Sequence, residues 1–459
     1  MSKFGLLSSG TSFKGQRNEK AIKMYEKNHE VTSIGELTDY SVLNQYHVSS
    51  EGDMAPTPIE DWSSLSKEMQ DSLQSMGYSQ PTPIQKYSIP CYRNMRPLIA
   101  ISPTGSGKTL AYAIPLLEKF QGVEKGDTQA IILVPSRELA SQVFRQFRRF
   151  SETLKVSVQL LRKNRDYPKC TILIATPKRL LQFSEKISSI KYVILDEADY
   201  LLSHSFVAQT DQVLSKVDSS NIHVAIFSAT MTQKVEDTAR SFMQSPVKIQ
   251  IGDEHVVSSL IKQELKFVGT EKGKIVEIIQ RIQAGTLGLP LMIFVMNKQR
   301  AYDLAGELPI PCSVLTSEEN DTERAESIKK LRTGESLILV ATDLGGRGID
   351  LPALQTVINF DLPPDSTTYI HRIGRTARAG RSGTAITFFT IDDQPNLRPV
   401  AIIMKKCGYE IEEYMLKPVD KKHRGARALF EPNQRKSISS KVWKNAKVRV
   451  PKPALDPST

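Results

Sequence analysis

The chain has 459 residues, of which 40% are hydrophobic and 24% are charged, and its formal net charge is +11. This composition is ordinary for a soluble globular protein, and the length predicts two domains with flanking segments. There is no apolar run of about 18 residues and no apolar core of signal-peptide length near the start, so we expect neither a membrane-spanning helix nor secretion. The four cysteines lack paired spacing, so we expect reduced thiols rather than disulfides or a zinc site.

Residues 1–60 are polar and show little periodicity, which predicts an N-terminal extension that is mostly flexible, with a possible helix over "RNEKAIKMYEKN". Residues 61–250 then alternate short β-branched runs with amphipathic stretches. The runs are "PLIAI", "AIILV", "TILIAT", "YVILD" and "HVAIFS". Buried strands that alternate with helices predict a parallel sheet covered on both faces.

A second series of the same kind covers residues 260–416. Its strand-like runs are "KQELKFV", "PLMIFV", "CSVLT", "SLILVAT", "TVINFD" and "GTAITFF". Residues 251–259 are polar and form the candidate linker. The expected fold class is therefore α/β, with two tandem domains, each a parallel β-sheet flanked by helices.

The positive charge is concentrated in a C-terminal tail, residues 417–459. Between Lys417 and Lys452, twelve Lys and Arg residues accompany only two acids. Such a segment suits a phosphate-rich partner through counterion release, and Phe430 and Trp443 are able to stack on bases. The alternatives are a solubilising tail, a localisation signal, or a segment that docks on the second domain.

The stretch "SPTGSGKT" (102–109) follows one strand-like run and precedes a helix-like one. It fits the phosphate-binding loop pattern except that Ser102 stands where glycine is usual. Its glycines allow backbone N–H groups to wrap phosphates, and the helix N-terminus adds partial positive charge. We expect Lys108 to reach the outer phosphates of a nucleotide and the Thr109 hydroxyl to bind Mg²⁺.

Two further motifs supply the remaining chemistry of phosphoryl transfer. "YVILDEAD" ends a strand in acids, which places Asp196 to hold Mg²⁺ and Glu197 to act as base for the attacking water. "YIHRIGRTARAGR" spaces Arg372, Arg375 and Arg378 at three-residue steps, which on a helix would form one face. These arginines are able to stabilise the negative charge that develops in the transition state. A simple phosphoryl-transfer kinase would not account for arginines in the second domain.

In their order, these motifs resemble a DEAD-box RNA helicase of superfamily 2. The matching motifs are "GYSQPTPIQ", "SPTGSGKT", "PSREL", "TPKRL", "DEAD", "SAT", "ATDLGGRGID" and "HRIGRTAR", and the resemblance covers Trp62 to Tyr414, about three quarters of the chain. The resemblance implies two RecA-like domains that close on ATP and RNA, and a core that works as a monomer. It also implies hydrolysis of ATP with Mg²⁺ to bend and locally unwind RNA. The motifs "PTPIQ", "DEAD" and "SAT" together disfavour the alternative of a DNA helicase of the same superfamily.

The resemblance also implies roles for individual residues. For the nucleotide they are Tyr78, Gln85, Ser102, Pro103, Thr104, Gly105, Ser106, Gly107, Lys108, Thr109, Asp350, Arg375 and Arg378. Catalysis would use Lys108, Asp196, Glu197, Arg375 and Arg378, with Thr109 and Asp196 at the metal. Coupling of nucleotide to RNA would use Asp199, Ser228, Thr230 and His371. RNA contacts would come from Pro135, Ser136, Arg137, Thr176, Pro177, Arg179, Arg324 and Thr342, which suit phosphates and 2′-hydroxyls without reading sequence.

The sequence departs from the family pattern mainly at glycines. "VQLLRKNRDYPK" lacks the usual Gly-Gly pair, Lys178 and Ala377 replace glycines, and "VLTSEEND" lacks the usual His-Gly. No nucleotide-contacting group is lost, so we expect ATP hydrolysis to survive. The missing glycines leave undecided whether the backbone follows the family's usual path beside the RNA. A slow-turnover RNA clamp is therefore the alternative to an active helicase.

A finer resemblance rests on "KQELKFVGTEKGK", "FFTIDDQPNLRPVA", "QRKSIS" and "LLSSGTSF" together with the loss of Gly-Gly. These stretches resemble the subgroup of the family that acts in small-ribosomal-subunit assembly. The resemblance implies pre-ribosomal RNA as the substrate, pre-ribosome components or a protein cofactor as partners, and a nucleolar location.

Overall fold

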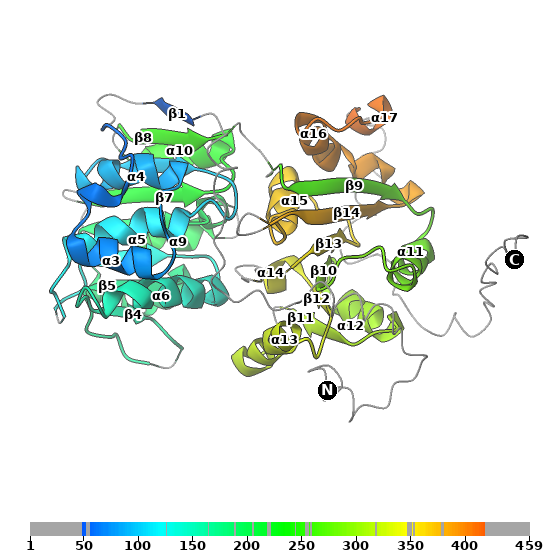
Figure 1. Cartoon of the computed structure of the whole chain (residues 1–459), viewed down its shortest axis with the longest axis horizontal. Helices are drawn as coiled ribbons and strands as arrows, with labels where there is room; N and C mark the ends of the chain where they lie inside the picture. The colour runs from blue at the N-terminus through cyan, green and yellow to red at the C-terminus, as the bar shows by residue number, and fades with distance from the viewer. Residues whose placement is uncertain are drawn as a thin grey trace, which may run out of the picture.

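The computed structural model describes residues 48–51, 56–124, 126–163, 165–187, 190–203, 206–217, 222–243, 245–252, 257, 259–316, 319–346, 351, 354–377 and 381–417. Two α/β domains stand side by side within these residues (Figure 1). Each is a sheet with helices on both faces, so the expected fold class is confirmed. No helix in these ranges combines the length and the apolar character needed to span a bilayer.

The described strands of the first domain form an eight-stranded sheet. In spatial order they are β1 (Val48–Glu51), β8 (Val247–Ile251), β2 (Leu98–Ile101), β7 (His223–Ser228), β6 (Tyr192–Asp196), β3 (Ala130–Leu133), β5 (Ile172–Ala175) and β4 (Val158–Leu160). All neighbours are parallel except β1, which runs antiparallel to β8. Val48–Glu51 lie within the N-terminal extension that was expected to be mostly flexible, and their backbone pairing with β8 makes them the edge of this sheet.

Helices cover both faces of the first sheet. They are η2 (Trp62–Ser64), α3 (Lys67–Ser75), α4 (Pro83–Arg93), α5 (Lys108–Lys119), α6 (Arg137–Ser151), α7 (Pro177–Leu180), η3 (Leu181–Lys186), α8 (Ala198–Leu201), α9 (Val207–Leu214) and α10 (Gln233–Phe242). Alternate strand residues enter two separate cores: Leu98 and Ala100 pack with α4, α5 and α6, whereas Ile99 and Ile101 pack with α7 to α10. This division follows from side chains that alternate between the faces of a strand.

The second sheet has six described strands, all parallel. In spatial order they are β11 (Cys312–Leu315), β12 (Ile338–Ala341), β10 (Leu291–Phe294), β13 (Thr356–Asn359), β14 (Gly383–Phe389) and β9 (Ile261–Phe267). Its helices are α11 (Glu271–Gln283), α12 (Lys298–Glu307), α13 (Asp321–Thr333), α14 (Asp343–Gly346), α15 (Ser366–Ile373), η5 (Ile391–Asn396), α16 (Arg398–Lys406) and α17 (Glu413–Leu416).

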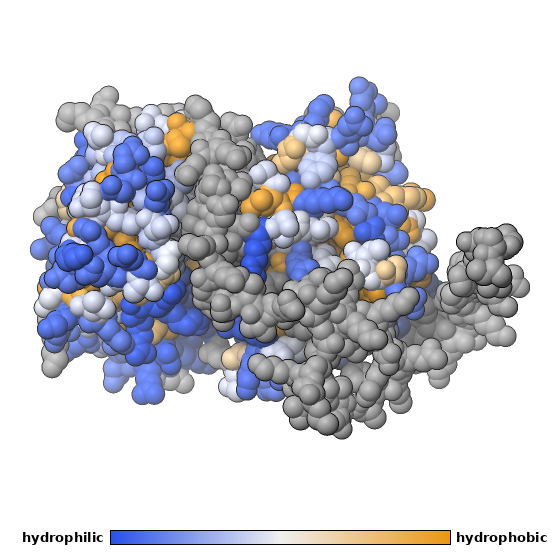
Figure 2. All heavy atoms as spheres, viewed as in Figure 1, coloured by the Kyte–Doolittle hydropathy of each residue, from blue (hydrophilic) through white to orange (hydrophobic). Residues whose placement is uncertain are grey.

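The surface of both domains is mostly hydrophilic in the view of Figure 2, with apolar side chains gathered toward the β9 and β14 side of the second domain. Phe267 and Ile391 are the most exposed of the large apolar residues there, at 49% and 63%. In Figure 1, α13, α14 and α15 lie on the side of the second domain that faces the first. These three helices therefore border the space between the domains.

Four sequence-based expectations lie outside the described residues. They are the possible helix in the N-terminal extension, the basic tail from residue 418 onward, and the site residues Asp350 and Arg378.

Candidate functional site: a nucleotide loop and a basic cleft between the domains

The phosphate-binding loop connects β2 to α5, as its sequence context predicts. Lys108 is the first residue of α5, and Gly107 before it has a φ of +92°, a conformation that favours glycine. The Lys108 ammonium donates to the carbonyl oxygens of Ser102 and Pro103 at 2.7 and 2.9 Å. The lysine therefore lies folded over the loop, where oxygen atoms of a nucleotide phosphate would also attract it.

The structure explains why serine is accommodated at the first position of the loop. Ser102 is 1% exposed, and its hydroxyl lies 2.6 Å from that of Ser106, also within the loop. Its backbone N–H donates to the carbonyl of Ser228 at the end of β7. The small side chain thus closes the loop on itself and leaves the space around Lys108 unblocked.

The predicted adenine-reading residues lie next to this loop. Gln85 Nε2 donates to the Gly107 carbonyl at 3.1 Å, and Gln85 Oε1 accepts from the backbone of Thr82 at 2.9 Å. A Cβ at position 107 would lie 2.5 Å from Gln85 Nε2, so the contact itself requires glycine. Tyr78 is half-buried, and its carbonyl accepts from the Trp62 indole at 3.0 Å. The contacts of Tyr78 and Gln85 with adenine remain predictions.

Asp196 ends β6 and is held by two hydrogen bonds. Its Oδ2 accepts from the Tyr112 hydroxyl at 2.8 Å, and its Oδ1 accepts from the backbone of Glu197 at 3.0 Å. Burial, with the nearby Glu197 charge, raises the pKa of Asp196 to about 6. A buried carboxylate near Lys108 is the kind of oxygen donor that Mg²⁺ prefers. Tyr112 was not among the predicted site residues, because nothing in the sequence shows that it reaches Asp196.

Glu197 has an unusual backbone and a carboxylate that faces the second domain. Its φ is +50°, which is uncommon for a residue other than glycine. Its Oε1 lies 3.7 Å from Arg375 Nη2, and its buried Oε2 has no hydrogen-bond partner among the described residues. Buried polar atoms in folded proteins normally have a hydrogen-bond partner, and a water molecule or a bound nucleotide would supply one for this oxygen.

The predicted coupling residues form one cluster across the domain boundary. Asp199 Oδ2 lies 2.7 Å from Nε2 of His371 on α15 and accepts from the Thr230 hydroxyl. The Ser228 hydroxyl donates to the Thr230 carbonyl at 2.7 Å. Burial alone would raise the pKa of Asp199, but His371 and these hydroxyls lower it. The cluster therefore links the end of β7 to the second domain through a single carboxylate.

The arginine motif differs from the sequence-based expectation. The helix α15 ends at Ile373, so Arg372 and Arg375 do not share one helical face, and this expectation is wrong. Arg372 is buried and binds both carboxylate oxygens of Asp343 at 2.6 and 2.8 Å, a contact inside the second domain. Arg375 lies after the helix and faces Glu197. At Gly374 between them, a Cβ would lie 2.3 Å from Thr104 Oγ1, so the second domain approaches the phosphate loop too closely for a side chain.

The predicted RNA residues lie on both sides of a second region between the domains. Pro135 and Ser136 lead from β3 into α6, which begins at Arg137, and Thr176 leads from β5 into α7, which contains Pro177 and Arg179; both turns lie at the same edge of the sheet. Arg137, Thr176 and Arg179 line a cleft with Arg324 of α13. Thr342 directly follows β12, and its hydroxyl accepts from the N–H of Gly345 at 3.3 Å.

Arg324 also forms a bridge between the domains. Its Nε donates to Glu138 Oε1 on α6 at 2.6 Å, and its other nitrogens donate to the carbonyls of Thr316 and Gly345. The role of this residue toward RNA remains a prediction, and the structure adds a contact across the domain boundary that the sequence did not reveal.

Comparison with known proteins identifies the family. The DEAD/DEAH box helicase model matches residues 82–238, and the helicase conserved C-terminal domain model matches residues 274–380. The probable ATP-dependent RNA helicase ddx52 of Dictyostelium discoideum is 35% identical over 397 residues, which cover 81% of this chain and 59% of that protein. The DEAD-box ATP-dependent RNA helicase 57 of Oryza sativa subsp. japonica is 37% identical over 402 residues, which cover 83% of this chain and 74% of that protein.

A solved structure shows the same likeness in three dimensions. Dbp5 of S. cerevisiae bound to RNA and ADP BeF3 aligns with a TM-score of 0.69 at 28% identity, and the alignment covers 81% of this chain and 99% of that one. Both domains of the chain are therefore matched in sequence and in structure, with the nucleotide loop, the acids and the arginine motif in their family order. The chain belongs to the DEAD-box ATP-dependent RNA helicases.

Proposed function

We propose that this helicase hydrolyses ATP with Mg²⁺ to bend and locally unwind pre-ribosomal RNA during assembly of the small ribosomal subunit. The observation that best supports this proposal is the contact of Glu197 with Arg375 beside the phosphate loop, since it unites a base and a cation from different domains. The choice of RNA rests on the subgroup resemblance of the sequence, and it implies a nucleolar location.

The nucleotide side of the mechanism follows from the positions of these side chains. Lys108 would bind the outer phosphates, and Thr109 and Asp196 would hold Mg²⁺, which neutralises phosphate charge when bound. Glu197 would orient the attacking water and accept its proton. Arg375 would lie against the charge that develops on the transferred phosphoryl group. Because Arg375 comes from the second domain, this set is complete only when the domains are together.

The RNA side follows from the cleft between Arg137, Arg179 and Arg324. Arginines, hydroxyls and helix N-termini bind phosphates and 2′-hydroxyls without reading bases, so we expect RNA selectivity with little sequence preference. The Asp199–His371 contact is connected to the nucleotide loop through Ser228, whose hydroxyl accepts from the Asp199 N–H and whose carbonyl accepts from the Ser102 N–H. Binding at one site would thus favour the domain arrangement that the other site needs.

The steady-state ATPase rate tests the proposal, measured with no nucleic acid, with single-stranded RNA and with DNA of the same sequence. We expect stimulation of tenfold or more by RNA alone. Equal rates in all three samples would refute an RNA-dependent helicase, and stimulation by DNA would point to a DNA-directed enzyme.

A slow RNA clamp is the second candidate, and the two cross-domain contacts of Asp199 with His371 and Glu138 with Arg324 favour it. Single-turnover strand separation, compared with the dwell time of the protein on RNA, distinguishes the two. A clamp would stay bound for many turnover times and separate no strands.

A further inference from the structure

The cleft between the domains carries far more positive charge than the predicted RNA residues account for. It has a volume of about 510 Å³, and eight Lys and Arg side chains line it together with a single carboxylate, that of Glu138. Arg324 already pairs with Glu138 at 2.6 Å. Five of the lining cations have no predicted role: Arg145, Arg162, Lys163, Arg165 and Arg332.

Three of these cations come from the loop that joins β4 to β5. Arg162, Lys163 and Arg165 are exposed, and no hydrogen bond or ion pair with another described residue holds any of them. The only acid of this loop, Asp166, does not line the cleft. Adjacent like charges without a counter-charge repel one another, so an arrangement that gathers them on one cleft favours an anionic ligand.

The chemistry of this loop resides in its side chains. No glycine occurs from Val158 to Lys169, so the backbone there lacks the freedom that lets consecutive N–H groups wrap a phosphate. Long cationic side chains reach a phosphate without any special backbone conformation. The loop can therefore bind an extended polyanion even though its backbone is not adapted to do so.

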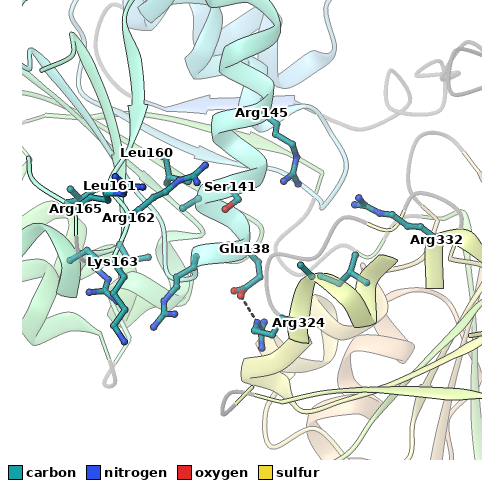
Figure 3. Close-up of a pocket in the computed structure, with 16 residues that line it drawn as sticks. Glu138, Ser141, Arg145, Leu160, Leu161, Arg162, Lys163, Arg165, Arg324 and Arg332 are labelled. Carbon is teal, nitrogen blue, oxygen red and sulfur yellow. Dashed lines mark hydrogen bonds and ion pairs between the residues drawn. The ribbon is translucent and has the colours of Figure 1, made fainter. Parts of the chain in front are cut away.

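The remaining two cations approach the cleft from opposite domains. Figure 3 shows Arg145 on α6 and Arg332 on α13, both pointing into the gap between the domains. Like charges on two facing surfaces oppose their approach, and a polyanion placed between them would reverse that effect. The ligand that fits is long enough to contact both domains and carries a charge at regular intervals.

We propose that Arg145, Arg162, Lys163, Arg165 and Arg332, here termed the basic rim, bind successive phosphates of single-stranded RNA. The rim lengthens the RNA contact beyond Arg137, Arg179 and Arg324, with which it shares one cleft. This inference rests on the proposed function. RNA fits better than an acidic protein because the charged side chains that the loop contributes to the cleft are all cations, and the aromatic anchors of protein interfaces do not occur among the residues that line the cleft.

Neutralising the loop tests the proposal. The variant carries Arg162→Gln, Lys163→Gln and Arg165→Gln, and the control carries Lys119→Gln, Arg149→Gln and Lys191→Gln, three exposed cations of the same domain outside the cleft. Fluorescence anisotropy gives the affinity for a polyuridine strand at several salt concentrations with a non-hydrolysable ATP analogue. Each lost phosphate contact should reduce the slope of log K against log salt by about 0.7, so the variant should lose about two units of slope.

We expect the affinity of the loop variant to fall at least tenfold at low salt while its ATP affinity without RNA and its melting temperature match the control. Arg332→Gln alone should reduce the slope by about 0.7, which tests the contribution of the second domain. A slope equal to that of the control would overturn the proposal. If the loop variant loses binding to polyglutamate while its salt slope for RNA is unchanged, the proposal is also overturned. The rim would then bind an acidic protein. If the wild type itself shows no ATP-dependent RNA binding, the proposed function fails instead.

Discussion

At the scale of single residues, the site depends on carboxylates whose surroundings differ. Asp196 is buried and each of its oxygens accepts a hydrogen bond, one from Tyr112 and one from the backbone, whereas Glu197 keeps one buried oxygen without a partner among the described residues. The motif "DEAD" predicts the roles of both acids, and its position directly after an apolar run places them at the end of a strand. The sequence could not predict Tyr112 as the partner of Asp196, because that contact depends on how α5 packs against β6. The different surroundings suit a metal-binding group beside a proton acceptor.

The substitution Glu197→Gln tests this assignment. Glutamine preserves the size of the side chain but cannot accept a proton, so we expect kcat to fall by a factor of about 10² to 10⁴. ATP binding should change less than twofold, since Lys108 and Asp196 are untouched. With ATP and RNA present, the variant should remain on RNA for longer than the wild type.

The measurements are the steady-state ATPase rate, the nucleotide affinity and the lifetime of the RNA complex. The control is Glu68→Gln, an exposed glutamate of α3 far from the loop in sequence. A Glu197→Gln enzyme that hydrolyses ATP as fast as this control would show that another group activates the water.

At the scale of elements, the sequence predicts every described strand of the second sheet, including both of its edges, but misses three strands of the first sheet. All eleven strand-like runs coincide with strands, and those of the interior strands are mostly apolar because such a strand is buried on both faces. The strands β1, β4 and β8 were not predicted, since their sequences "VSSE", "VQL" and "VKIQI" mix polar and apolar residues. In β8, for example, Lys248 is 9% exposed and pairs with Glu236 of α10 at 2.9 Å. Only the tertiary partner makes that lysine compatible with a buried strand.

The first residue of β7 makes the stability of the first domain depend on pH. His223 is 2% exposed, packs 4.5 Å from the ring of Tyr92 and lies 2.6 Å from the Arg96 carbonyl through Nε2. Burial lowers the pKa of His223 to about 4. Between pH 6.5 and pH 4 the unfolded chain therefore binds a proton that the folded chain does not, and the free energy of unfolding falls as the pH falls. At pH 5 this loss should be about 2 kcal/mol.

Urea unfolding at pH 7.5 and pH 5.0 checks this prediction in the wild type and in His223→Gln, whose side chain can donate to the Arg96 carbonyl but does not titrate. The variant should be less stable at pH 7.5, and the difference between the two proteins should shrink by about 2 kcal/mol at pH 5.0. If the free energies of unfolding of the two proteins differ by the same amount at pH 7.5 and at pH 5.0, His223 does not carry this pH dependence.

At the scale of the whole molecule, the chemistry is divided between two domains that are each stable through their own cores. The sequence predicts both domains and assigns the base to one and the arginine to the other. It could not predict which arrangement of the domains the structure adopts, because the contacts between them involve residues far apart in the chain. His371 and Asp199 are 172 positions apart, and Arg324 and Glu138 are 186 positions apart. These two contacts hold the domains together at the nucleotide side and at the RNA side.

The Glu138–Arg324 ion pair should stabilise the closed arrangement, and Glu138→Gln tests this role. The Arg324 guanidinium is buried, with its side chain 8% exposed, and loses its only described carboxylate partner in this variant. The carbonyls of Thr316 and Gly345 would still hold it in place. Leaving a buried charge without its partner costs several kcal/mol at most sites, part of which the glutamine amide oxygen offsets, so we expect closure to weaken by about 1–3 kcal/mol.

Energy transfer between one dye on each domain measures the closed fraction with RNA and a non-hydrolysable ATP analogue. The matched control is Glu152→Gln, because among the described residues the Glu152 carboxylate pairs only with Arg148, near the end of α6, and both side chains are more than half exposed. We expect Glu138→Gln to need about 5 to 150 times more RNA than this control to reach the same closed fraction, while ATP affinity without RNA stays equal. If both variants close at the same RNA concentration, the ion pair does not stabilise closure, and the contacts on the nucleotide side, Asp199 with His371 and Glu197 with Arg375, connect the domains without it.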